Sequence, residues 1–584
     1  MGNAFLEIKF LKDFVFLSDI STSLSMSEGK SFSPKTYWNK GDKNTLVNSL
    51  SESRGKSLNI TFKNMITYSK RFNEIHNVTA MFGTESISNQ SNSMSASVND
   101  FTSEELDYRF LSAGEGIKNN SGSGNANTMF SVLGRINYSF KDRYILTGIV
   151  RRDGSSRFGK NNKYGTFPSV SAAWRVTEEP FINIHFLDDF KLKASYGKTG
   201  NSDIGNYAFA SNYGTSASTS SYPMLGNPNS VTQGISLQSI GNSNIKWETT
   251  TMTNFGFDAT LFNNRLNVEF DYFIKKTTDI LQRITYPATA GVATSPMVNI
   301  GEMQNKGIEL AINYRGSSGR DFNYDIGVGI WGYRNEVLKL VNNQYLSSGD
   351  YNRSDVGLPI GQFYGFILDG IFQTQEEVDN HATQTAKAVG RWILRDVNGD
   401  GRINDSDRTY IGDPHPDFEY SINGRFQYKN FDLTLFFQGT YGNDLCFASK
   451  RGQTSTDFWG DYSNKSTRIL NTWTPDNRNA ELPEINILNP NNESNRVTTY
   501  LIEDGSYIRL KNLELGYTIP TSVLAKVGIK QTRFFVSAEN LFTITKYNNI
   551  DPEVRSTNDQ QRGVDNVNNI PITKYFLAGF TLSF

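Results

Sequence analysis

The last nine residues, 576 to 584, alternate between apolar and other side chains and end on a phenylalanine. One face of this segment carries only apolar residues: Phe576, Ala578, Phe580, Leu582 and Phe584. A soluble domain seldom ends on a strand with a fully apolar outward face, whereas a β-barrel in an outer membrane presents apolar side chains to lipid at every second position. The pattern predicts a closing strand of a membrane barrel.

The composition agrees with an all-β barrel. Mean hydropathy is −0.47, and no window approaches the roughly 18 consecutive apolar residues of a membrane-spanning helix. A barrel can be hydrophilic on average, because alternate residues of each strand face a polar lumen. The 28 Tyr and 40 Phe are then expected to form aromatic girdles at the two membrane interfaces.

Charge and cysteine content exclude other classes. The net charge is −1, with 58 basic and 59 acidic residues. No basic stripe is interleaved with aromatic residues, so no nucleic-acid partner is expected. The single cysteine, Cys446, cannot form an intramolecular disulfide and has no companion at metal-ligand spacing.

Alternation recurs along the chain. Apolar or aromatic residues share one face in segments that begin near Phe130, Tyr144, Val170, Phe190, Phe255, Leu266, Ile308, Tyr420 and Phe431. Tight turns are predicted at Lys141-Asp142, Asn263-Asn264 and Lys429-Asn430. The opposite faces are polar and suit a wet lumen. Their charged members include Arg135, Arg175, Lys191, Lys193, Glu269, Asp271 and Arg425.

Connection lengths alternate between short and long. Short connections are expected near 11 to 14, 69 to 74, 141 to 142, 178 to 189, 263 to 264, 316 to 320, 429 to 430 and 520 to 531. Long polar ones are expected near 28 to 54, 91 to 125, 152 to 163, 199 to 243, 282 to 300, 338 to 416, 447 to 505 and 546 to 571. Outer-membrane barrels have short periplasmic turns and long extracellular loops, so the long connections are predicted to be extracellular.

This pattern gives about 17 strands. The first strand (Ala4 to Phe10) and the last (Ile572 to Phe584) are expected to run in the same direction, which cannot close an antiparallel barrel. The segment after Met1 enters a strand without the features of a signal peptide. The chain is therefore expected to be the C-terminal part of a larger barrel.

Several phrases together resemble the SusC/RagA type of TonB-dependent outer-membrane transporters of Bacteroidetes. They are Gly134-Arg-Ile-Asn-Tyr-Ser-Phe-Lys-Asp-Arg-Tyr144, Arg151-Arg-Asp-Gly-Ser-Ser-Arg-Phe-Gly159, Phe167-Pro-Ser-Val-Ser-Ala-Ala-Trp-Arg175, Leu192-Lys-Ala-Ser-Tyr-Gly-Lys-Thr-Gly-Asn201, Lys246-Trp-Glu-Thr-Thr250, Asn305-Lys-Gly-Ile-Glu309, Trp473-Thr-Pro475 and Tyr507-Ile-Arg-Leu-Lys-Asn-Leu-Glu-Leu-Gly-Tyr517. Each phrase alone is a weak signal, but their order and spacing are specific from about residue 130 to the end.

The resemblance implies a 22-stranded barrel that imports oligosaccharides or peptides. It also implies a SusD-like lipoprotein lid, a plug domain in the lumen and energy supplied by TonB. The plug and about the first five strands are expected to lie before Met1 and to be absent from this chain, which places energised transport by this polypeptide alone in doubt. Siderophore or vitamin uptake stays open within the transporter class. The rival from another class is a surface-displayed barrel that acts as an adhesin-like binding module.

A calcium-type motif lies within the long external loop 338 to 416. Residues 396 to 407 place side-chain oxygens of Asp396, Asn398 and Asp400 at positions 1, 3 and 5, the backbone carbonyl of Arg402 at position 7 and the carboxylate of Asp407 at position 12. We expect structural Ca²⁺ here, with Asp407 in place of the longer Glu. The alternative is a surface turn rich in Asn, Asp and Gly that needs no metal.

No enzyme chemistry is expected. The four histidines, His76, His185, His381 and His415, lack ligand spacing, and no nucleophile elbow, Walker A loop, H-E-x-x-H or C-x-x-C motif occurs. Loop aromatics could contact cargo or a lid, but for any one of them packing is the more probable role. They are Tyr207, Phe209, Tyr213, Tyr222, Trp459, Tyr462 and Trp473. No ligand-binding residue is assigned.

Overall fold

A computed structural model gives the fold. It describes all residues except 37–44, 216–219, 224–230, 285–293, 455–464, 487–495, 525–528, 555, 557, 566–570 and 584. The chain divides into two compact units. The first contains Met1–Trp174, Ala194–Met252 and Thr277–Gly301, and the second contains Arg175–Lys193, Thr253–Lys276 and Glu302–Phe584.

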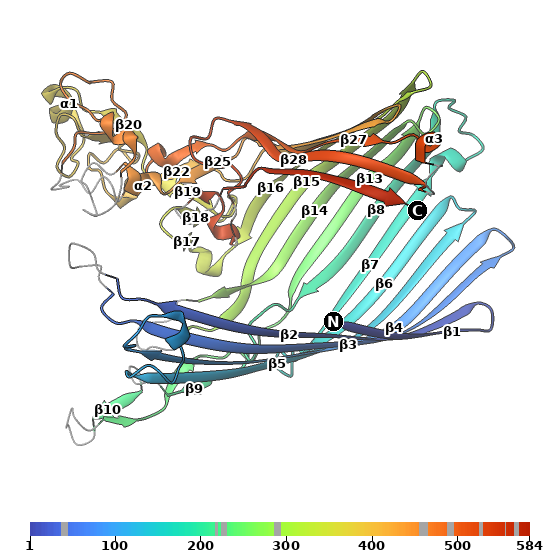
Figure 1. The fold of residues 1–584 in the computed structure, drawn as a ribbon, viewed down its shortest axis with the longest axis horizontal. Helices are drawn as coiled ribbons and strands as arrows, with labels where there is room; N and C mark the ends of the chain where they lie inside the picture. The colour runs from blue at the N-terminus through green and yellow to red at the C-terminus, as the bar shows by residue number, and fades with distance from the viewer. Residues whose placement is uncertain are drawn as a thin grey trace. The chain divides into compact units, whose positions relative to one another are not determined.

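Seventeen strands form one sheet (Figure 1), as the alternation predicted. They are β1 (Gly2–Phe10), β2 (Phe14–Ser33), β3 (Ser49–Phe72), β4 (His76–Asn99), β5 (Lys118–Phe140), β6 (Tyr144–Ser155), β7 (Tyr164–Arg175), β8 (Leu187–Asn201), β13 (Glu248–Leu261), β14 (Leu266–Arg283), β15 (Met297–Ser318), β16 (Phe322–Lys339), β23 (Phe418–Tyr428), β24 (Phe431–Tyr441), β27 (Tyr507–Thr518), β28 (Gln531–Thr545) and β30 (Tyr575–Ser583). The pairing is antiparallel, and the all-β prediction is confirmed.

In the first unit, each strand from β1 to β7 pairs with the next in the chain. Strands β2 to β5 have 20, 24, 24 and 23 residues, whereas about 9 to 11 residues cross a bilayer. The expected loops near 28 to 54 and 91 to 125 were therefore too long, because residues 28–33, 49–54, 91–99 and 118–125 extend the strands. Serine and asparagine fill these extensions without the apolar alternation that marks a strand.

Tight turns join strands at one end of each hairpin, which we call the short-turn end; the opposite end is the long-loop end. Lys141 and Asp142 have φ values of 53° and 55°, and Asn263 and Asn264 have 58° and 61°. Positive φ at two successive central residues is the backbone geometry of a type I′ turn, although three residues separate β5 from β6 and four separate β13 from β14. The turns predicted at these residues are confirmed, and Lys429, with φ 53°, begins the third.

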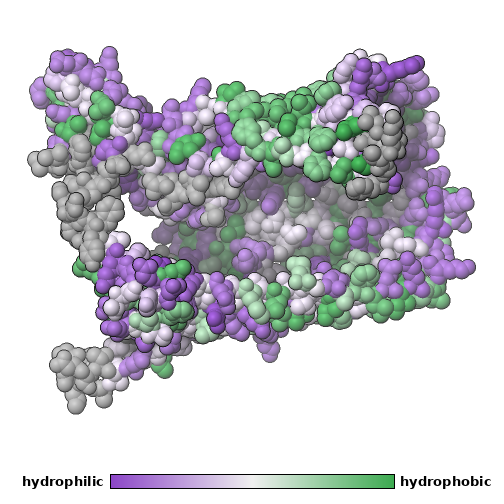
Figure 2. Space-filling view, in the orientation of Figure 1, coloured by the Kyte–Doolittle hydropathy of each residue, from purple (hydrophilic) through white to green (hydrophobic). Residues whose placement is uncertain are grey.

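Apolar side chains cover the outward face of the strands. In the first unit Ile136, Phe82 and Val150 are 58%, 56% and 52% exposed. In the second unit, Figure 2 shows hydrophobic residues gathered over β27 and β28, where exposed side chains include Leu515, Phe534, Val536 and Phe542. These are the faces that the alternation assigned to lipid.

The long connections of the second unit fold into a structured loop assembly, which we define as the described residues of 340–417, 442–506 and 546–574. Its strands are β17 (Leu346–Ser348), β18 (Asn352–Ser354), β19 (Gln362–Gly365), β20 (Leu368–Ile371), β21 (Trp392–Leu394), β22 (Thr409–Gly412), β25 (Asp444–Phe447), β26 (Ile502–Asp504) and β29 (Val564–Asp565). Its α-helices are α1 (Gln375–Asn380) and α2 (Lys450–Gln453), and short 3₁₀ turns lie at Val341–Asn343, Asp405–Asp407, Thr467–Leu470, Thr499–Leu501 and Asp559–Gln561.

The remaining elements are short. In the first unit they are β9 (Asn212–Gly214), β10 (Ser221–Pro223), β11 (Val231–Gln233), β12 (Ser236–Ser239) and a 3₁₀ turn at Leu106–Tyr108; in the second they are α3 (Thr521–Leu524) and a 3₁₀ turn at Val176–Glu178. No helix among the described residues combines the length and apolar character needed to traverse a bilayer.

Candidate functional site

The inner face of the extended strands β2 to β5 carries only serine, asparagine and glycine over five successive cross-strand rungs. We call this surface the hydroxyl-amide face. Its rungs are Ser23, Asn59, Asn89, Asn127; Ser25, Ser57, Ser91, Asn125; Ser27, Gly55, Ser93, Ser123; Gly29, Ser53, Ser95, Ser121; and Ser31, Ser51, Ser97, Asn119. On β5 it continues without a break in register to Arg135, which was predicted to line the lumen. The face therefore extends the polar side of the sheet toward the long-loop end.

Cross-strand hydrogen bonds join side chains across this face. The hydroxyl oxygens of Ser93 and Ser123 lie 2.8 Å apart, and those of Ser95 and Ser121 also lie 2.8 Å apart. Gly55 leaves room for a serine hydroxyl, because a Cβ there would lie 2.6 Å from Ser27 Oγ. Strand spacing of about 4.8 Å and a rung spacing of about 6.8 Å set the lattice of polar groups. The lattice offers uncharged donors and acceptors at a regular pitch.

Closer to the short-turn end, the same side of the first unit carries paired charges. Arg151 Nη2 lies 2.6 Å from Glu85 Oε2, and Arg151 Nε lies 2.7 Å from Asp153 Oδ1. Lys63 Nζ adds a contact of 3.4 Å to Glu85. Because acids and bases pair across strands, this wall is polar without a strong field of either sign.

The second unit confirms part of the predicted charged wall. Lys193 Nζ lies 2.8 Å from Asp258 Oδ1 and 2.7 Å from Asp271 Oδ2, while Lys191 Nζ lies 2.7 Å from Asp258 Oδ2. Arg175 Nη2 lies 3.2 Å from Asp189 Oδ1. Of the other predicted residues, Arg135 donates to Asn137 Oδ1 at 3.2 Å, and Glu269 and Arg425 are exposed.

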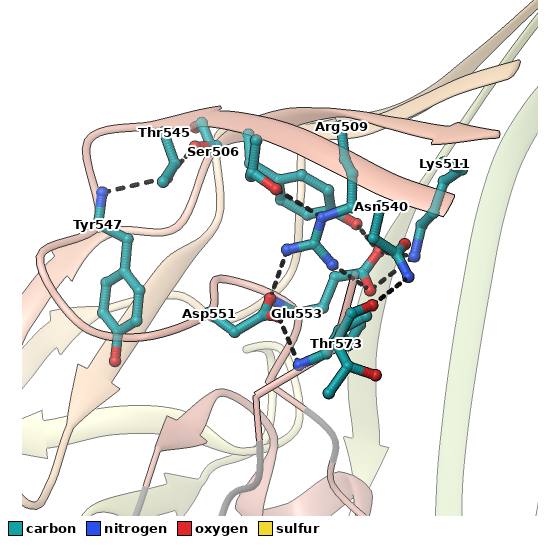
Figure 3. A network of polar contacts seen from close by, with 12 residues as sticks. Ser506, Arg509, Lys511, Asn540, Thr545, Tyr547, Asp551, Glu553 and Thr573 are labelled. Atoms are coloured by element: carbon teal, nitrogen blue, oxygen red, sulfur yellow. Dashed lines mark hydrogen bonds and ion pairs between the residues drawn. The ribbon is translucent and has the colours of Figure 1, made fainter. Parts of the chain in front are cut away.

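A denser ionic network joins β27 to the connection between β28 and β30 (Figure 3). Arg509 is 4% exposed, and its guanidinium lies 2.7 Å from Asp551 Oδ1 and 2.9 Å from Glu553 Oε2. Lys511 Nζ lies 2.6 Å from Glu553 Oε1, to which the Tyr507 hydroxyl also donates. Buried charges need partners in good geometry, so this network fixes the connection against the wall.

The same connection is fastened at two further points. The side-chain amide of Asn540 donates to Thr573 O at 3.1 Å (Figure 3), and the backbone N–H of Ile572 donates to Asp551 Oδ2 at 3.2 Å. At its other end, the Tyr547 hydroxyl donates to Asp565 Oδ2 at 2.5 Å. Burial and the neighbouring carboxylate raise the pKa of Tyr547, so the phenol stays protonated and keeps donating.

The loop assembly has its own apolar core. Phe363, Cys446 and Leu501 are almost fully buried in one cluster: Phe363 comes from 340–417, Cys446 and Leu501 come from the two ends of 442–506, and Val564 of 546–574 packs against them. Strand β25 pairs antiparallel with β26, at the other end of 442–506, and parallel with β29, in 546–574. Burial raises the pKa of the Cys446 thiol. The long connections thus form a packed body with its own interior.

His415 lies in the assembly just before β23. Its imidazole Nε2 donates to Ile360 O at 2.8 Å, and its Nδ1 lies 3.5 Å from the Tyr333 hydroxyl, which in turn accepts from Arg562 at 2.8 Å. Burial lowers the pKa of His415. Its backbone N–H donates to Asp413 Oδ1 at 2.9 Å, so the imidazole lies among a carbonyl, a phenol, a guanidinium and carboxylates.

In the predicted calcium loop, the carboxylate oxygens accept hydrogen bonds from backbone N–H groups of the loop itself. Asp396 accepts from Gly399 N–H and Gly401 N–H, each at 2.8 Å. Asp407 is fully buried and accepts from Val397 N–H at 3.1 Å and Asn404 N–H at 2.8 Å. The backbone donors lower the pKa of Asp396. Among the described residues, no three His, Cys, Asp or Glu side chains gather as a metal-binding group.

The loop aromatics divide between exposed and packed positions. Tyr207, Tyr213 and Tyr222 are more than half exposed, whereas Phe209 packs against the cluster around Trp247. Trp473 is buried, and its indole N–H donates to Gln373 Oε1 at 3.0 Å. Trp459 and Tyr462 lie outside the described residues.

Two features were not predicted. The hydroxyl-amide face could have been found from serine, or glycine at 29 and 55, at every second position in 21 to 33 and 49 to 57, which is a period-two signal without apolar residues. The ionic network had a weaker signal: Arg509 and Lys511 share one face of a predicted strand, and Asp551 and Glu553 have the same spacing. Arg509 and Asp551 are 42 residues apart in the sequence, so only the tertiary fold brings them into contact.

Comparison with known proteins found a matching family model and several relatives of this chain. The family model described as TonB dependent receptor-like, beta-barrel matches residues 16–541. TonB-dependent receptor P3 of Formosa agariphila is 34% identical over 542 residues, covering 90% of this chain and 52% of the relative. TonB-dependent receptor SusC of Bacteroides thetaiotaomicron is 30% identical over 470 residues, covering 78% and 44%.

A solved structure matches this chain over the full length of the chain. The structure titled RagAB peptide transporter matches with a TM-score of 0.83 at 26% identity, covering 100% of this chain and 61% of that chain. The RagAB peptide importer in its open-open state gives 0.84, with 60% of that chain covered. The present chain spans about half the length of the curated relatives it matches.

Proposed function

This chain belongs to the family of TonB-dependent receptor β-barrels, and we propose that it forms the wall and outer loops of an importer that takes up an oligosaccharide or a peptide. The family consists of outer-membrane receptors, and SusC is among the relatives of this chain. The paired strands with apolar outward faces are the membrane wall of such a barrel.

The hydroxyl-amide face is the observation that carries the choice of cargo class. Its serine and asparagine groups can exchange hydrogen bonds with the hydroxyls of a sugar chain or with peptide groups. It carries no charge over the five rungs, and the charges nearer the short turns are already paired. A large, hydrogen-bonding and uncharged cargo suits these surfaces better than a small highly charged one.

We further propose that the long-loop end is extracellular and that the loop assembly meets a SusD-like lipoprotein. Short periplasmic turns and long external loops are the usual asymmetry of these barrels. The packed core around Phe363, Cys446 and Leu501 gives the assembly a fixed surface for a partner. Energy from TonB is proposed for the whole protein. The peptide cargo named for RagAB makes peptide one of the two cargo classes to test.

Structural calcium is proposed for residues 396 to 407. The ligands would be the side chains of Asp396, Asn398, Asp400 and Asp407 and the carbonyl of Arg402. An ionised carboxylate has about four lone-pair sites, so Asp396 and Asp407 retain acceptor capacity beyond their two backbone N–H groups each. Binding there would clip the loop together without taking part in transport.

The function is tested in the source cell by deleting the gene and supplying either a neutral oligosaccharide mixture or a peptide mixture. We expect one mixture to be depleted from the medium by the parent and not by the deletion strain, with restoration by the gene. Equal depletion of both mixtures by the two strains would overturn import. Cargo bound at the cell surface but never depleted would favour the adhesin-like alternative.

A further inference from the structure

A groove of about 720 Å³ lies on the outward face of the first unit. It crosses β2 to β8, and its walls include Phe14, Ile66, Phe82, Ile136, Val170 and Tyr196. These are the apolar side chains that the strand alternation points away from the polar face. The volume lies within the roughly 300 to 1,000 Å³ of ordinary small-molecule sites.

The groove arises from small residues placed among large ones in two neighbouring rungs. In one rung Ala80 pairs with Ile136, which pairs with Gly148, which pairs with Val170. In the next, Phe82 pairs with Gly134, which pairs with Val150, and Val150 pairs with Pro168. The small positions adjoin diagonally, so they form a continuous floor between larger side chains.

The floor is open space and not a packed contact. A Cβ added at Gly134 or at Gly148 would meet no heavy atom within 4 Å, whereas one at Gly83, on the opposite face of β4, would meet Met65 Cγ at 2.9 Å. Neither Gly134 nor Gly148 has positive φ. Glycine weakens a strand interior, and here it is required neither by backbone conformation nor by close packing.

The position of the groove indicates what fills it. Ala80 lies four residues from the start of β4 at His76, and Gly134 lies six residues from the end of β5 at Phe140. At about 3.4 Å per residue, the floor lies about 14 to 20 Å along the strands from the short turns. With strands tilted by about 40° this is about 11 to 15 Å along the membrane normal, within the roughly 15 Å that the acyl chains of one leaflet occupy in an apolar core about 30 Å thick.

The β1–β2, β3–β4 and β5–β6 turns beside the groove carry more basic than acidic side chains, whereas the β7–β8 connection carries Glu178 and Glu179. Lys12, Lys70, Arg71, Lys141 and Arg143 stand against Asp13, Glu74 and Asp142. Lys141 Nζ lies 5.5 Å from the Phe140 ring centroid, at the end of β5. An anionic lipid headgroup at the level of these turns would place its acyl chain alongside the groove.

We propose that this groove is a binding site for one acyl chain of a phospholipid in the leaflet on the short-turn side. The groove continues the lipid-facing surface of a membrane wall, so the occupant comes from the bilayer itself. The choice of the periplasmic leaflet, where phospholipid and not lipopolysaccharide is found, rests on the proposed orientation of the barrel.

The test is native mass spectrometry of the protein purified from its own outer membrane in a mild detergent. The variant is Gly134→Leu with Gly148→Leu, which fills the floor. The matched control is Ala172→Leu, which adds the same side chain at an exposed outward position of β7 outside the groove. Heat-modifiable migration on gels checks that each variant forms its barrel.

We expect wild type and the control to retain one phospholipid and the double variant to lose it. Losing the contacts of two or three methylenes lowers affinity by roughly tenfold or more. Equal retention by all three proteins, or no lipid on the folded wild type, would overturn the site. Lipopolysaccharide in place of phospholipid would overturn the assigned leaflet. A wild type that retains phospholipid but fails the uptake assay would leave the site standing and refute the transport proposal alone.

Discussion

Arg509 on β27 lies 2.7 Å from Asp551 in the connection between β28 and β30, through its Nη2 and the Oδ1 of the carboxylate. The two residues are 42 positions apart. Arg509 is 4% exposed and Asp551 is 14% exposed, so the contact is largely withdrawn from water. It ties a long connection to the polar side of the wall.

Replacing Arg509 with Ala should free this connection. Two carboxylates would lose their buried partner, and removing one member of such a pair costs about 3 to 5 kcal/mol. We expect limited proteolysis to cut within 546–574 much faster in the variant. Lys511→Ala is the control, because it leaves Arg509 with both Asp551 and Glu553. Equal cutting of both variants would mean that the connection is held by other contacts.

Cys446 should react very slowly with a thiol reagent in the native protein. It is fully buried in the loop assembly, and burial raises its thiol pKa, while the thiolate is the reactive form. Since it is the single cysteine of the chain, labelling measured by mass spectrometry reports opening of the assembly directly. Rapid labelling without denaturant would contradict a closed core around Phe363 and Leu501.

Acidification should loosen the assembly through His415. Burial lowers the pKa of this imidazole in the folded state. The neutral form is therefore favoured on folding, and the stabilisation is present above the ordinary pKa of about 6.5 and lost as pH falls below it, by at most about 1.4 kcal/mol per pH unit.

The measurement is the labelling rate of Cys446 between pH 7.5 and 5.5, corrected for the thiolate fraction of a free thiol. His415→Gln retains an N–H donor for Ile360 O but does not titrate. We expect the rise at low pH to be smaller in this variant. The same rise in both proteins would assign the effect to other groups.

Calcium should protect the loop 396–407 from proteolysis in a saturable way. A clip closed by Asp407 would hold Asp396, Asn398 and Asp400 in one conformation, and a chelator should reverse the effect. Asp407→Ala should abolish this saturable protection by calcium, whereas Asp405→Asn, at an exposed neighbouring carboxylate, should not. Protection that is unchanged by millimolar calcium in the wild type would favour the metal-free turn.

Bulky apolar residues on the hydroxyl-amide face should reduce uptake of the cargo that the depletion assay identifies. Ser57→Leu with Ser91→Leu alters adjacent positions of one rung, where leucine removes hydroxyls that are proposed to exchange hydrogen bonds with cargo. Ser88→Leu, on the opposite face of β4, serves as the control. We expect a fall of several-fold for the double variant only. Equal uptake by all three strains would remove this face from the route of the cargo.

Sequence reasoning predicted the wall well, because alternation and turn chemistry are local signals. Phe130 to Phe140 and the turn at Lys141-Asp142 form as predicted. It failed where polar residues form strands, since Ser93 on β4 and Ser123 on β5 lie in segments without an apolar period and yet pair across the two strands. The loop assembly could not be predicted either, because Phe363 meets Cys446 and Leu501 only after two distant connections fold together.

The regularity of the hydroxyl-amide face has a kinetic consequence. A molecule that moves along the rungs exchanges each weak hydrogen bond for a nearly identical one on the next rung, at about 6.8 Å intervals. Its free energy therefore changes little from step to step, and no single rung acts as a trap. Such a surface would lower the friction of sliding while keeping the molecule close, so movement over this face of the first unit would be diffusion in two dimensions.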